Sequence, residues 1–100
     1  MNRCYFCHSP LITKNNYIPH SKYSHCNSCE ETYKITLIQN QAFGCHRVNI
    51  ILNDVSVILF FDSNTTEIYD INFNLILTLP FINITPANVH DKVATYLLFQ

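Results

Sequence analysis

Two pairs of cysteines constrain this chain more than any other feature of its sequence. Cys4 and Cys7, and again Cys26 and Cys29, have the spacing C-x2-C, and eighteen residues separate the two pairs. Thiolates two residues apart on a tight turn can bind the same ion. Two such turns supply the tetrahedral four-sulfur shell that Zn(II) prefers, with bonds of about 2.3 Å. We therefore predict that these four cysteines hold one structural Zn(II) ion with no open coordination position.

This spacing resembles that of the zinc-ribbon and zinc-knuckle class, and the resemblance covers residues 1–35. In ribbon knuckles the residue after the second cysteine is usually glycine. Here it is His8 after the first pair and Glu30 after the second. The resemblance implies a zinc ribbon of two short hairpins, in which the ion stabilises the fold and takes no part in catalysis.

Three other uses of the cysteines are compatible with their spacing. Disulfides need an oxidising compartment, which nothing in the sequence indicates. Covalent haem attachment fits the run C-x-x-C-H from Cys4 to His8, but it leaves the second cysteine pair without a role. A redox-active C-x-x-C motif requires a helix N-terminus that acidifies one thiol, and it again explains only one pair.

A two-cysteine two-histidine finger is a fourth alternative. Cys4, Cys7, His20 and His25 fit the pattern C-x2-C-x12-H-x4-H. Such a finger presents both histidines from a helix, and Pro19, directly before His20, would break that helix. We therefore expect the histidines of the first thirty residues to lie on the surface or to donate to thiolate sulfur.

The composition indicates one globular domain. A chain of 100 residues, 48% apolar and only 13% charged, is neither a disordered segment nor a coiled coil. The longest apolar run, Val57 to Phe61, is too short to cross a bilayer, and the first residues begin no secretory signal. We expect a soluble cytoplasmic protein. Twelve Asn and twelve Ile against three Ala and one Gly resemble the bias of phage and mobile-element proteins, for which the compartment would be the host cytoplasm.

Beyond the cysteine pairs, apolar segments alternate with turn-forming residues. Thr85 and Pro86 are typical of a helix start, and apolar residues recur at helical spacing after them. We predict a single α+β domain with a zinc ribbon over residues 1–32. Residues 33–100 would form an antiparallel β-meander of about five strands and one C-terminal α-helix packed on the sheet. The predicted strands are Tyr33–Gln39, Val48–Leu52, Val55–Phe61, Thr66–Ile71 and Leu75–Phe81, the helix covers residues 86–99, and Cys45 is a small buried hydrophobe.

One hairpin fixes the predicted orientation of the sheet. Asn53 and Asp54 separate two apolar runs and favour a tight turn between them. In register, this hairpin gives one wholly apolar sheet face, which we expect the C-terminal helix to cover. The pairs on that face are Val48 with Leu59, Ile50 with Val57 and Leu52 with Val55.

The opposite face of the predicted sheet mixes apolar and polar residues. Exposed apolar patches often mark sites where a partner binds. The sequence contains no Gly-rich phosphate loop, Ser-based nucleophile elbow or deaminase motif, so we expect neither an enzyme nor a small-molecule substrate. We predict a non-catalytic protein-interaction module that modulates a host or viral assembly or self-associates. Its partner-binding residues would be Ile51, Ile58, Phe60 and Tyr69.

A nucleic-acid-binding zinc ribbon is the alternative function. Residues 1–50 carry five basic and two acidic residues, whereas residues 51–100 carry one basic and five acidic residues. Any anion-seeking surface therefore lies in the N-terminal half, although no run of like charges stands out. Aromatic residues beside cations can stack on single-stranded bases. The candidate contacts are Arg3, Lys14, Tyr17 and Lys22.

Overall fold

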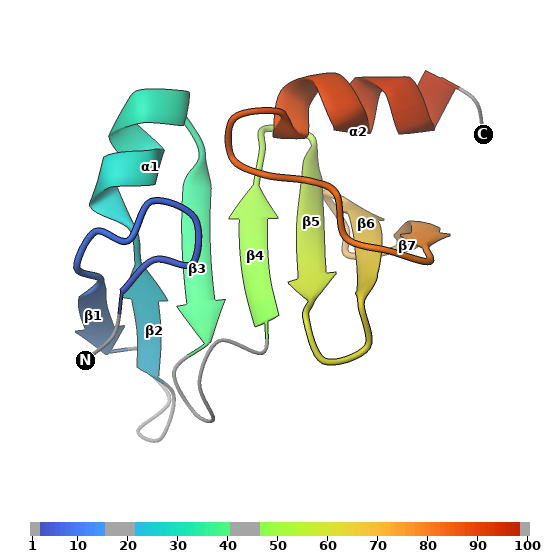
Figure 1. Ribbon diagram of the computed structural model, residues 1–100. Helices are drawn as coiled ribbons and strands as arrows, with labels where there is room; N and C mark the ends of the chain where they lie inside the picture. The colour runs from blue at the N-terminus through green and yellow to red at the C-terminus, as the bar shows by residue number, and fades with distance from the viewer. Residues whose placement is uncertain (1–2, 16–21, 41–46, 99–100) are drawn as a thin grey trace.

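The computed structural model describes residues 3–15, 22–40 and 47–98, and this part of the chain forms an antiparallel sheet with two helices (Figure 1). Its seven strands lie side by side in the order of the sequence, and each is antiparallel to the next. The fold class is therefore α+β, as predicted. The elements are β1 (Ile12–Asn15), β2 (Lys22–His25), α1 (Asn27–Tyr33), β3 (Thr36–Asn40), β4 (Arg47–Ile51), β5 (Val55–Phe60), β6 (Thr65–Asp70), β7 (Leu75–Leu79) and α2 (Val89–Leu98).

The predicted meander is confirmed from β4 onward. The ends of β4 to β7 differ from the predicted ends by no more than two residues. At the tight turn between β4 and β5, the Leu52 amide donates to the Val55 carbonyl over 2.9 Å. The register is the predicted one, with Ile50 opposite Val57. The Asn53-Asp54 turn and the apolar runs on either side of it were therefore sufficient to predict the register of this hairpin.

The N-terminal third differs in detail from the predicted ribbon of short hairpins, chiefly because it contains a helix, α1. The strand predicted over Tyr33–Gln39 begins only at Thr36, because the preceding residues form α1. Lys34 ends this helix in the left-handed conformation, with φ 56° and ψ 46°. Two further strands, β1 and β2, form a hairpin beside β3. Cys45, predicted to be a buried hydrophobe, lies outside the described residues.

The C-terminal helix begins at Val89, later than predicted. Residues 86–88 form a turn, so Thr85 is not the helix cap. The Asn88 carbonyl instead accepts the first helical hydrogen bond, from the Lys92 amide over 2.9 Å. The Asn88 side chain also accepts from the Thr85 amide over 2.7 Å. In the part of the chain described, neither helix is long and apolar enough to cross a membrane.

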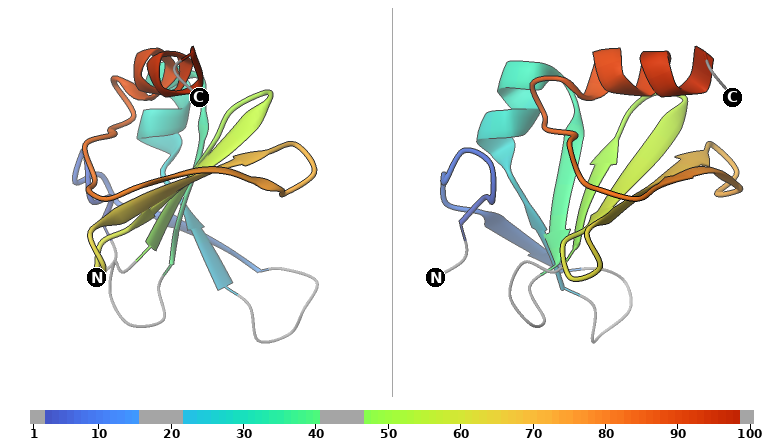
Figure 2. Two further views of the ribbon diagram at one scale, coloured as in Figure 1. Left: turned by 90° about the vertical axis from the view of Figure 1, so that its right-hand side faces the viewer. Right: turned by 45° about the vertical axis from the view of Figure 1, so that its right-hand side comes forward.

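The sheet has one covered and one open face (Figure 2). On the covered side, here called the inner face, lie residues 3–10, residues 80–88 and α2. Residues 80–88 run across the middle of this face, and α2 lies over the ends of the strands with Val89 and Val93 in the core. No described element covers the other side, the outer face. Fully buried apolar side chains on the strands of the inner face are Leu37, Val48, Ile50, Val57, Leu59 and Ile68.

Candidate metal centre

The first cysteine pair lies in a tight loop, residues 3–10, which we call the knuckle. Arg3 and Pro10 close it through an isolated antiparallel bridge. Within it, the Cys4 carbonyl accepts from the His8 amide over 3.0 Å, and the Cys4 sulfur accepts from the Phe6 amide over 3.4 Å. His8 has φ 63°, the left-handed conformation that favours glycine. The position at which ribbon knuckles usually carry glycine therefore has the backbone geometry of one.

The knuckle is attached to the sheet by Gln39 of β3. This side chain is only 5% exposed and lies on the inner face, beside Val48. Its oxygen accepts from the Tyr5 amide over 3.1 Å, and its nitrogen donates to the Arg3 carbonyl over 2.9 Å. Sequence reasoning did not identify Gln39. The available signal was a polar residue at an inner-face position of a strand.

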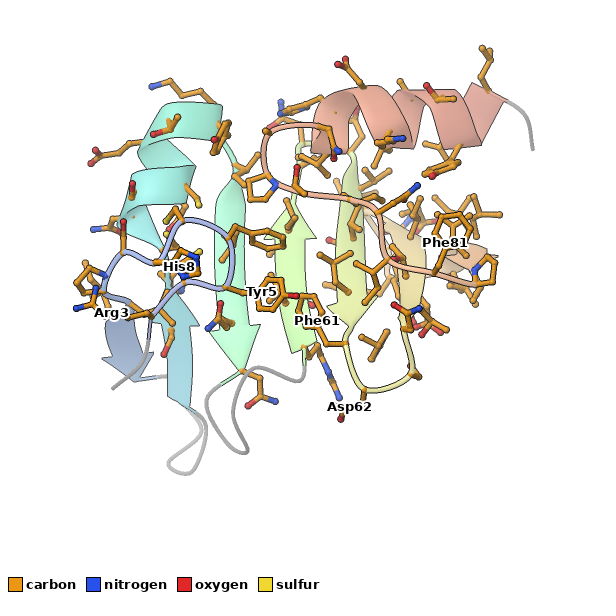
Figure 3. All side chains as sticks on the ribbon, in the orientation of Figure 1. Arg3, Tyr5, His8, Phe61, Asp62 and Phe81 are labelled. Atoms are coloured by element: carbon orange, nitrogen blue, oxygen red, sulfur yellow. The ribbon has the colours of Figure 1, made fainter. Side chains whose placement is uncertain are left out.

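Aromatic contacts add to this attachment. The Tyr5 ring lies against the Phe61 ring with centroids 4.3 Å apart, as the labelled side chains show (Figure 3). Tyr5 also meets Phe6 edge to face at 5.3 Å. The knuckle is therefore docked on β3 and on the end of β5 by side chains as well as by its own backbone.

The second cysteine pair lies at the start of α1 and not on a second hairpin, which corrects that detail of the ribbon prediction. Cys26 caps the helix, because its sulfur accepts from the Cys29 amide over 3.4 Å and its carbonyl accepts from the Glu30 amide over 3.0 Å. The Cys26 amide donates to the Leu37 carbonyl of β3 over 3.3 Å. Both halves of the site are thus tied to the same strand.

The four sulfurs form one compact cluster. All lie within 4.8 Å of one another, with 3.8 Å between Cys4 and Cys29 and 3.4 Å between Cys7 and Cys26. A tetrahedral ion with bonds of about 2.3 Å holds its sulfurs about 3.8 Å apart, so the cluster fits such an ion. The four cysteines are free in this structure, because the closest pairs of sulfurs are farther apart than the roughly 2.05 Å of a disulfide bond. They are positioned to hold one metal ion, and a four-sulfur set fits zinc.

The four cysteine ligands differ in how deeply they are buried, and burial shifts the pKa values of their thiols. Burial and hydrogen bonds to neighbouring thiols raise the pKa of Cys29, and burial raises the pKa of Cys26 to about 11. Cys7 is exposed, and although partial burial acts to raise its pKa, hydrogen bonds with Ser9 outweigh that effect and lower it to about 6. A cation must therefore displace protons from the buried pair, whereas Cys7 offers a thiolate at neutral pH.

The histidines of the finger alternative do not join the sulfurs in the described part of the chain. His25 Nδ1 lies 3.6 Å from Glu30 Oε1, beside the cluster. His20 lies outside the described residues, and His8 is exposed. The metal-ligating group found among the described residues consists of Cys4, Cys7, Cys26 and Cys29 alone.

The predicted partner-binding residues all lie on the outer face. The register places Ile51 and Tyr69 in one row, each beside Ser56, and places Ile58 and Phe60 in the two following rows. All four are half-buried. Whether they bind a partner stays a prediction.

The predicted nucleic-acid contacts are more scattered. Arg3 is exposed, and its guanidinium donates to the His8 carbonyl over 2.9 Å within the knuckle. Lys14 and Lys22 lie on the adjacent strands β1 and β2, where Lys14 pairs with Tyr23 and Lys22 with Asn15. Tyr17 lies outside the described residues. This use of the basic N-terminal half likewise stays a prediction.

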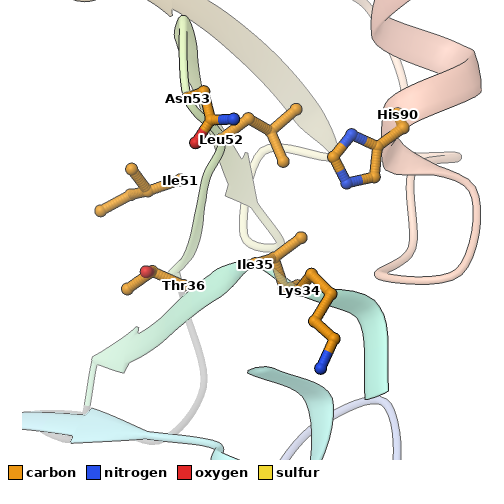
Figure 4. Close-up of a pocket in the computed structure, with 7 residues that line it drawn as sticks. All are labelled: Lys34, Ile35, Thr36, Ile51, Leu52, Asn53 and His90. Carbon is orange, nitrogen blue, oxygen red and sulfur yellow. The ribbon is translucent and has the colours of Figure 1, made fainter. Parts of the chain in front are cut away.

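A cavity of about 380 Å³ opens between the start of β3, the β4–β5 turn and the start of α2 (Figure 4). Most of its lining surface is polar, and Lys34 and His90 are the basic residues in its wall. The sequence singled out neither of them. The lining residues are Lys34, Ile35, Thr36, Ile51, Leu52, Asn53 and His90.

Comparison with known proteins adds no further information on this site. The chain matches no protein-family model, no curated protein and no solved structure. Its function must therefore be argued from its own residues.

Proposed function

We propose that this chain is a non-catalytic, zinc-stabilised protein-interaction module of a phage or other mobile element, which modulates a host or viral assembly in the host cytoplasm. The observation that carries the proposal is the half-apolar outer face, which no described element covers. The Asn- and Ile-rich, Ala- and Gly-poor composition supports the origin.

Apolar residues run across the outer face from strand to strand. Ile38, Asn49 and Ile58 lie side by side on β3, β4 and β5, and Ile51 and Tyr69 belong to the neighbouring row. None of these residues belongs to the buried core cluster or packs against it. Covering them with another protein would remove apolar surface from water at about 25 cal/mol per Å², which favours association.

Residue types that often dominate binding energy lie on the same face. The Arg47 guanidinium lies over the Phe60 ring, 5.2 Å from its centroid. The Tyr69 hydroxyl donates to the Glu67 carboxylate over 2.5 Å. Tyr and Arg are enriched among interface hot spots, and contacts that hold their side chains in place reduce the entropy lost on binding.

In this function the metal has a structural role. A four-sulfur shell leaves no coordination position for a substrate. The ion would join the knuckle to α1, and both are bonded to β3 through Gln39 and Leu37. Ile38 lies between these two residues on the outer side of the same strand. Metal binding therefore supports the strand that carries one side of the proposed contact surface.

The test uses a charge placed at the centre of the outer face. Ile58→Lys introduces it there, and Leu98→Lys introduces the same charge at the exposed end of α2. A partner would be captured from host lysate with the wild-type chain, purified and titrated against all three proteins by calorimetry. We expect Ile58→Lys to weaken binding by about tenfold or more and Leu98→Lys to leave it unchanged.

Zinc content and thermal unfolding of both variants provide the control for folding. Equal partner affinity of Ile58→Lys and wild type, with both folded, would reject the outer face as the contact surface. If the wild-type chain captures no partner from the lysate, or only partners that Ile58→Lys captures equally well, the interaction function itself is rejected.

The wild-type chain and the Ile58→Lys variant also distinguish the alternative function, nucleic-acid binding, from the proposed one. Arg3, Lys14 and Lys22 lie at the knuckle end of the sheet, away from Ile58. If they contact phosphates, a labelled single strand will bind in low salt, and its affinity will fall steeply as salt is added, equally for wild type and Ile58→Lys. Absence of binding in low salt would eliminate this alternative.

A further inference from the structure

The four sulfurs of the metal centre differ in their contact with solvent. Cys7 is exposed on the knuckle, whereas each of the other three cysteine ligands is no more than 1% exposed. The reactivity of a thiol toward an oxidant follows its thiolate character and its exposure. Although partial burial acts to raise the pKa of Cys7, hydrogen bonds from Ser9 lower it to about 6. Cys7 therefore combines both properties.

A second sulfur stands close to that of Cys7, on a different element. The Cys7 and Cys26 sulfurs are 3.4 Å apart, and the Cys4 and Cys29 sulfurs are 3.8 Å apart. Each of these contacts joins the knuckle to the start of α1, so neither lies within a C-x2-C motif. Closing the shorter contact to the length of a disulfide bond requires a movement of about 1.4 Å.

Cys26 is held in position for such a reaction. Its sulfur accepts from the Cys29 amide over 3.4 Å, and its own amide donates to the Leu37 carbonyl of β3 over 3.3 Å. A hydrogen bond from a backbone amide to sulfur favours the thiolate form. A thiol that coordinates a metal ion is deprotonated in any case. In the loaded chain, Cys26 is therefore a fixed thiolate beside the exposed Cys7.

We propose that Cys7 is a redox-sensing modification site, at which hydrogen peroxide oxidises the sulfur and Cys26 then closes a disulfide between the knuckle and α1. First, the Cys7 thiolate attacks a peroxide oxygen: an S–O bond forms, the O–O bond breaks and hydroxide leaves. Next, the Cys26 thiolate attacks the Cys7 sulfur: an S–S bond forms, the S–O bond breaks and a second hydroxide leaves. Two thiolates thus lose two electrons, and one peroxide is reduced to two hydroxide ions.

This disulfide replaces the metal ion as the link between the two halves of the site. It withdraws two of the four ligands, so the site can no longer hold the ion. The knuckle stays on the sheet, because the bonds from Gln39 to the backbone of Tyr5 and Arg3 do not involve the metal. A dithiol reductant restores the thiolates and the capacity to bind the ion. Disulfides in reducing compartments are usually transient in this way.

The sulfur contacts select one pairing. Four cysteines can form two disulfides in three ways. The distances predict Cys7 with Cys26 first and, with a second peroxide, Cys4 with Cys29. Both bonds join the knuckle to α1, so neither oxidation separates the halves of the site. The inference concerns the metal centre alone and depends neither on the outer face nor on any partner.

The experiment treats the full zinc-loaded chain with increasing amounts of hydrogen peroxide. A chromophoric chelator reports zinc release, and mass spectrometry of alkylated, unreduced peptides identifies each disulfide. We expect the first disulfide to join Cys7 to Cys26 and the ion to be released as it forms. Reduction followed by added zinc should reload the chain. A first disulfide within a C-x2-C pair, one that contains Cys45, or zinc release without any disulfide would overturn the proposal.

Cys7→His separates oxidation from the loss of a ligand. Histidine can complete a three-cysteine one-histidine zinc site without an exposed sulfur, so peroxide should release zinc at least about tenfold more slowly. Cys45→Ser keeps both cysteine pairs and should release zinc at the wild-type rate. A loaded Cys7→His variant that also releases zinc at that rate would contradict the role of Cys7. If Cys7→His binds no zinc before treatment, the disulfide map of the wild type decides alone.

Discussion

At the scale of single residues, the cysteines have two different surroundings. Cys26 and Cys29 are buried and hydrogen-bonded at the start of α1, whereas Cys7 is exposed on the knuckle. The four ligands were predicted correctly from their spacing alone, because C-x2-C is a local constraint. Gln39 was not, because its role depends on a fold that brings residue 39 next to residues 3 and 5.

Cys26→Ser should unfold the N-terminal third. The variant removes a metal ligand and the sulfur that caps α1, and structural zinc contributes about 10–16 kcal/mol to small metal modules. Zinc content and thermal unfolding are the measurements. Cys45→Ser is the matched control, because Cys45 stands outside both C-x2-C pairs, and it should bind one ion per chain. A Cys26→Ser variant with wild-type zinc content and melting temperature would contradict the four-sulfur site.

His8→Gly should raise the stability of the knuckle. The left-handed conformation costs His8 about 1–2 kcal/mol, and relief of this cost outweighs the additional chain entropy of glycine, about 0.5–1 kcal/mol. The same substitution at His90, which lies in α2, should instead destabilise by about 1 kcal/mol. Denaturant unfolding of the two zinc-loaded variants tests whether the signs are opposite. A loss of stability at both positions would contradict the argument.

At the scale of helices and strands, the elements stabilised by local sequence patterns were predicted correctly, and those stabilised by tertiary contacts were not. β4 to β7 are rich in β-branched and other apolar residues and are separated by turn-forming residues, and this pattern located them. The buried residue of α1 is Cys29, so the sequence of this segment has no stripe of apolar residues at helical spacing that would predict a helix. It is stabilised by the Cys26 cap and by contact with β3. Its sequence was therefore assigned in part to a strand.

The start of α2 was misplaced for a similar reason. Thr85-Pro86 is a good local start signal, but tertiary contacts favour a turn there. Asn83 accepts from the Tyr96 hydroxyl over 3.0 Å and from the Asn88 amide side chain over 3.4 Å. These bonds join the segment before the helix to the helix itself, and no local pattern encodes them.

Gln39→Met should loosen the knuckle from the sheet while leaving the ligands in place. Met fills a similar volume but makes neither hydrogen bond, which leaves the Tyr5 amide and the Arg3 carbonyl without their partner at a cost of about 1–3 kcal/mol. We expect faster zinc loss to a chelator and a lower melting temperature. Zinc loss at the wild-type rate in Gln39→Met would show that the knuckle is held by its other contacts.

At the scale of the whole molecule, the sheet joins two chemically different ends. The cysteine cluster lies by β1–β3, and the charge-free strand β7 lies at the other end (Figure 1). The sequence predicted the metal end through a motif and the outer face through register. It did not predict which strand is last in the sheet, because that depends on the complete topology.

Metal retention by the whole chain should fall as the pH is lowered. Protons compete with the ion for thiolates, and Cys26 and Cys29, whose pKa values are raised, release protons when they bind it. Below about pH 6, Cys7 also becomes protonated, so the affinity should fall more steeply there. Competition with a chromophoric chelator at a series of pH values measures this. Affinity that does not change between neutral pH and about pH 5 would show that the thiolates are not the ligands.

The exposure of Cys7 also determines how the metal centre can be attacked. Three of its sulfurs are sealed in the core, so an oxidant or alkylating reagent in solution reaches the cluster through Cys7. Damage at that one atom would remove one of the two ligands that the knuckle supplies, whereas Cys26 and Cys29 would stay buried at the start of α1, where the Cys26 amide is bonded to Leu37 of β3. The chemical reactivity of the whole metal centre therefore depends on one accessible sulfur atom.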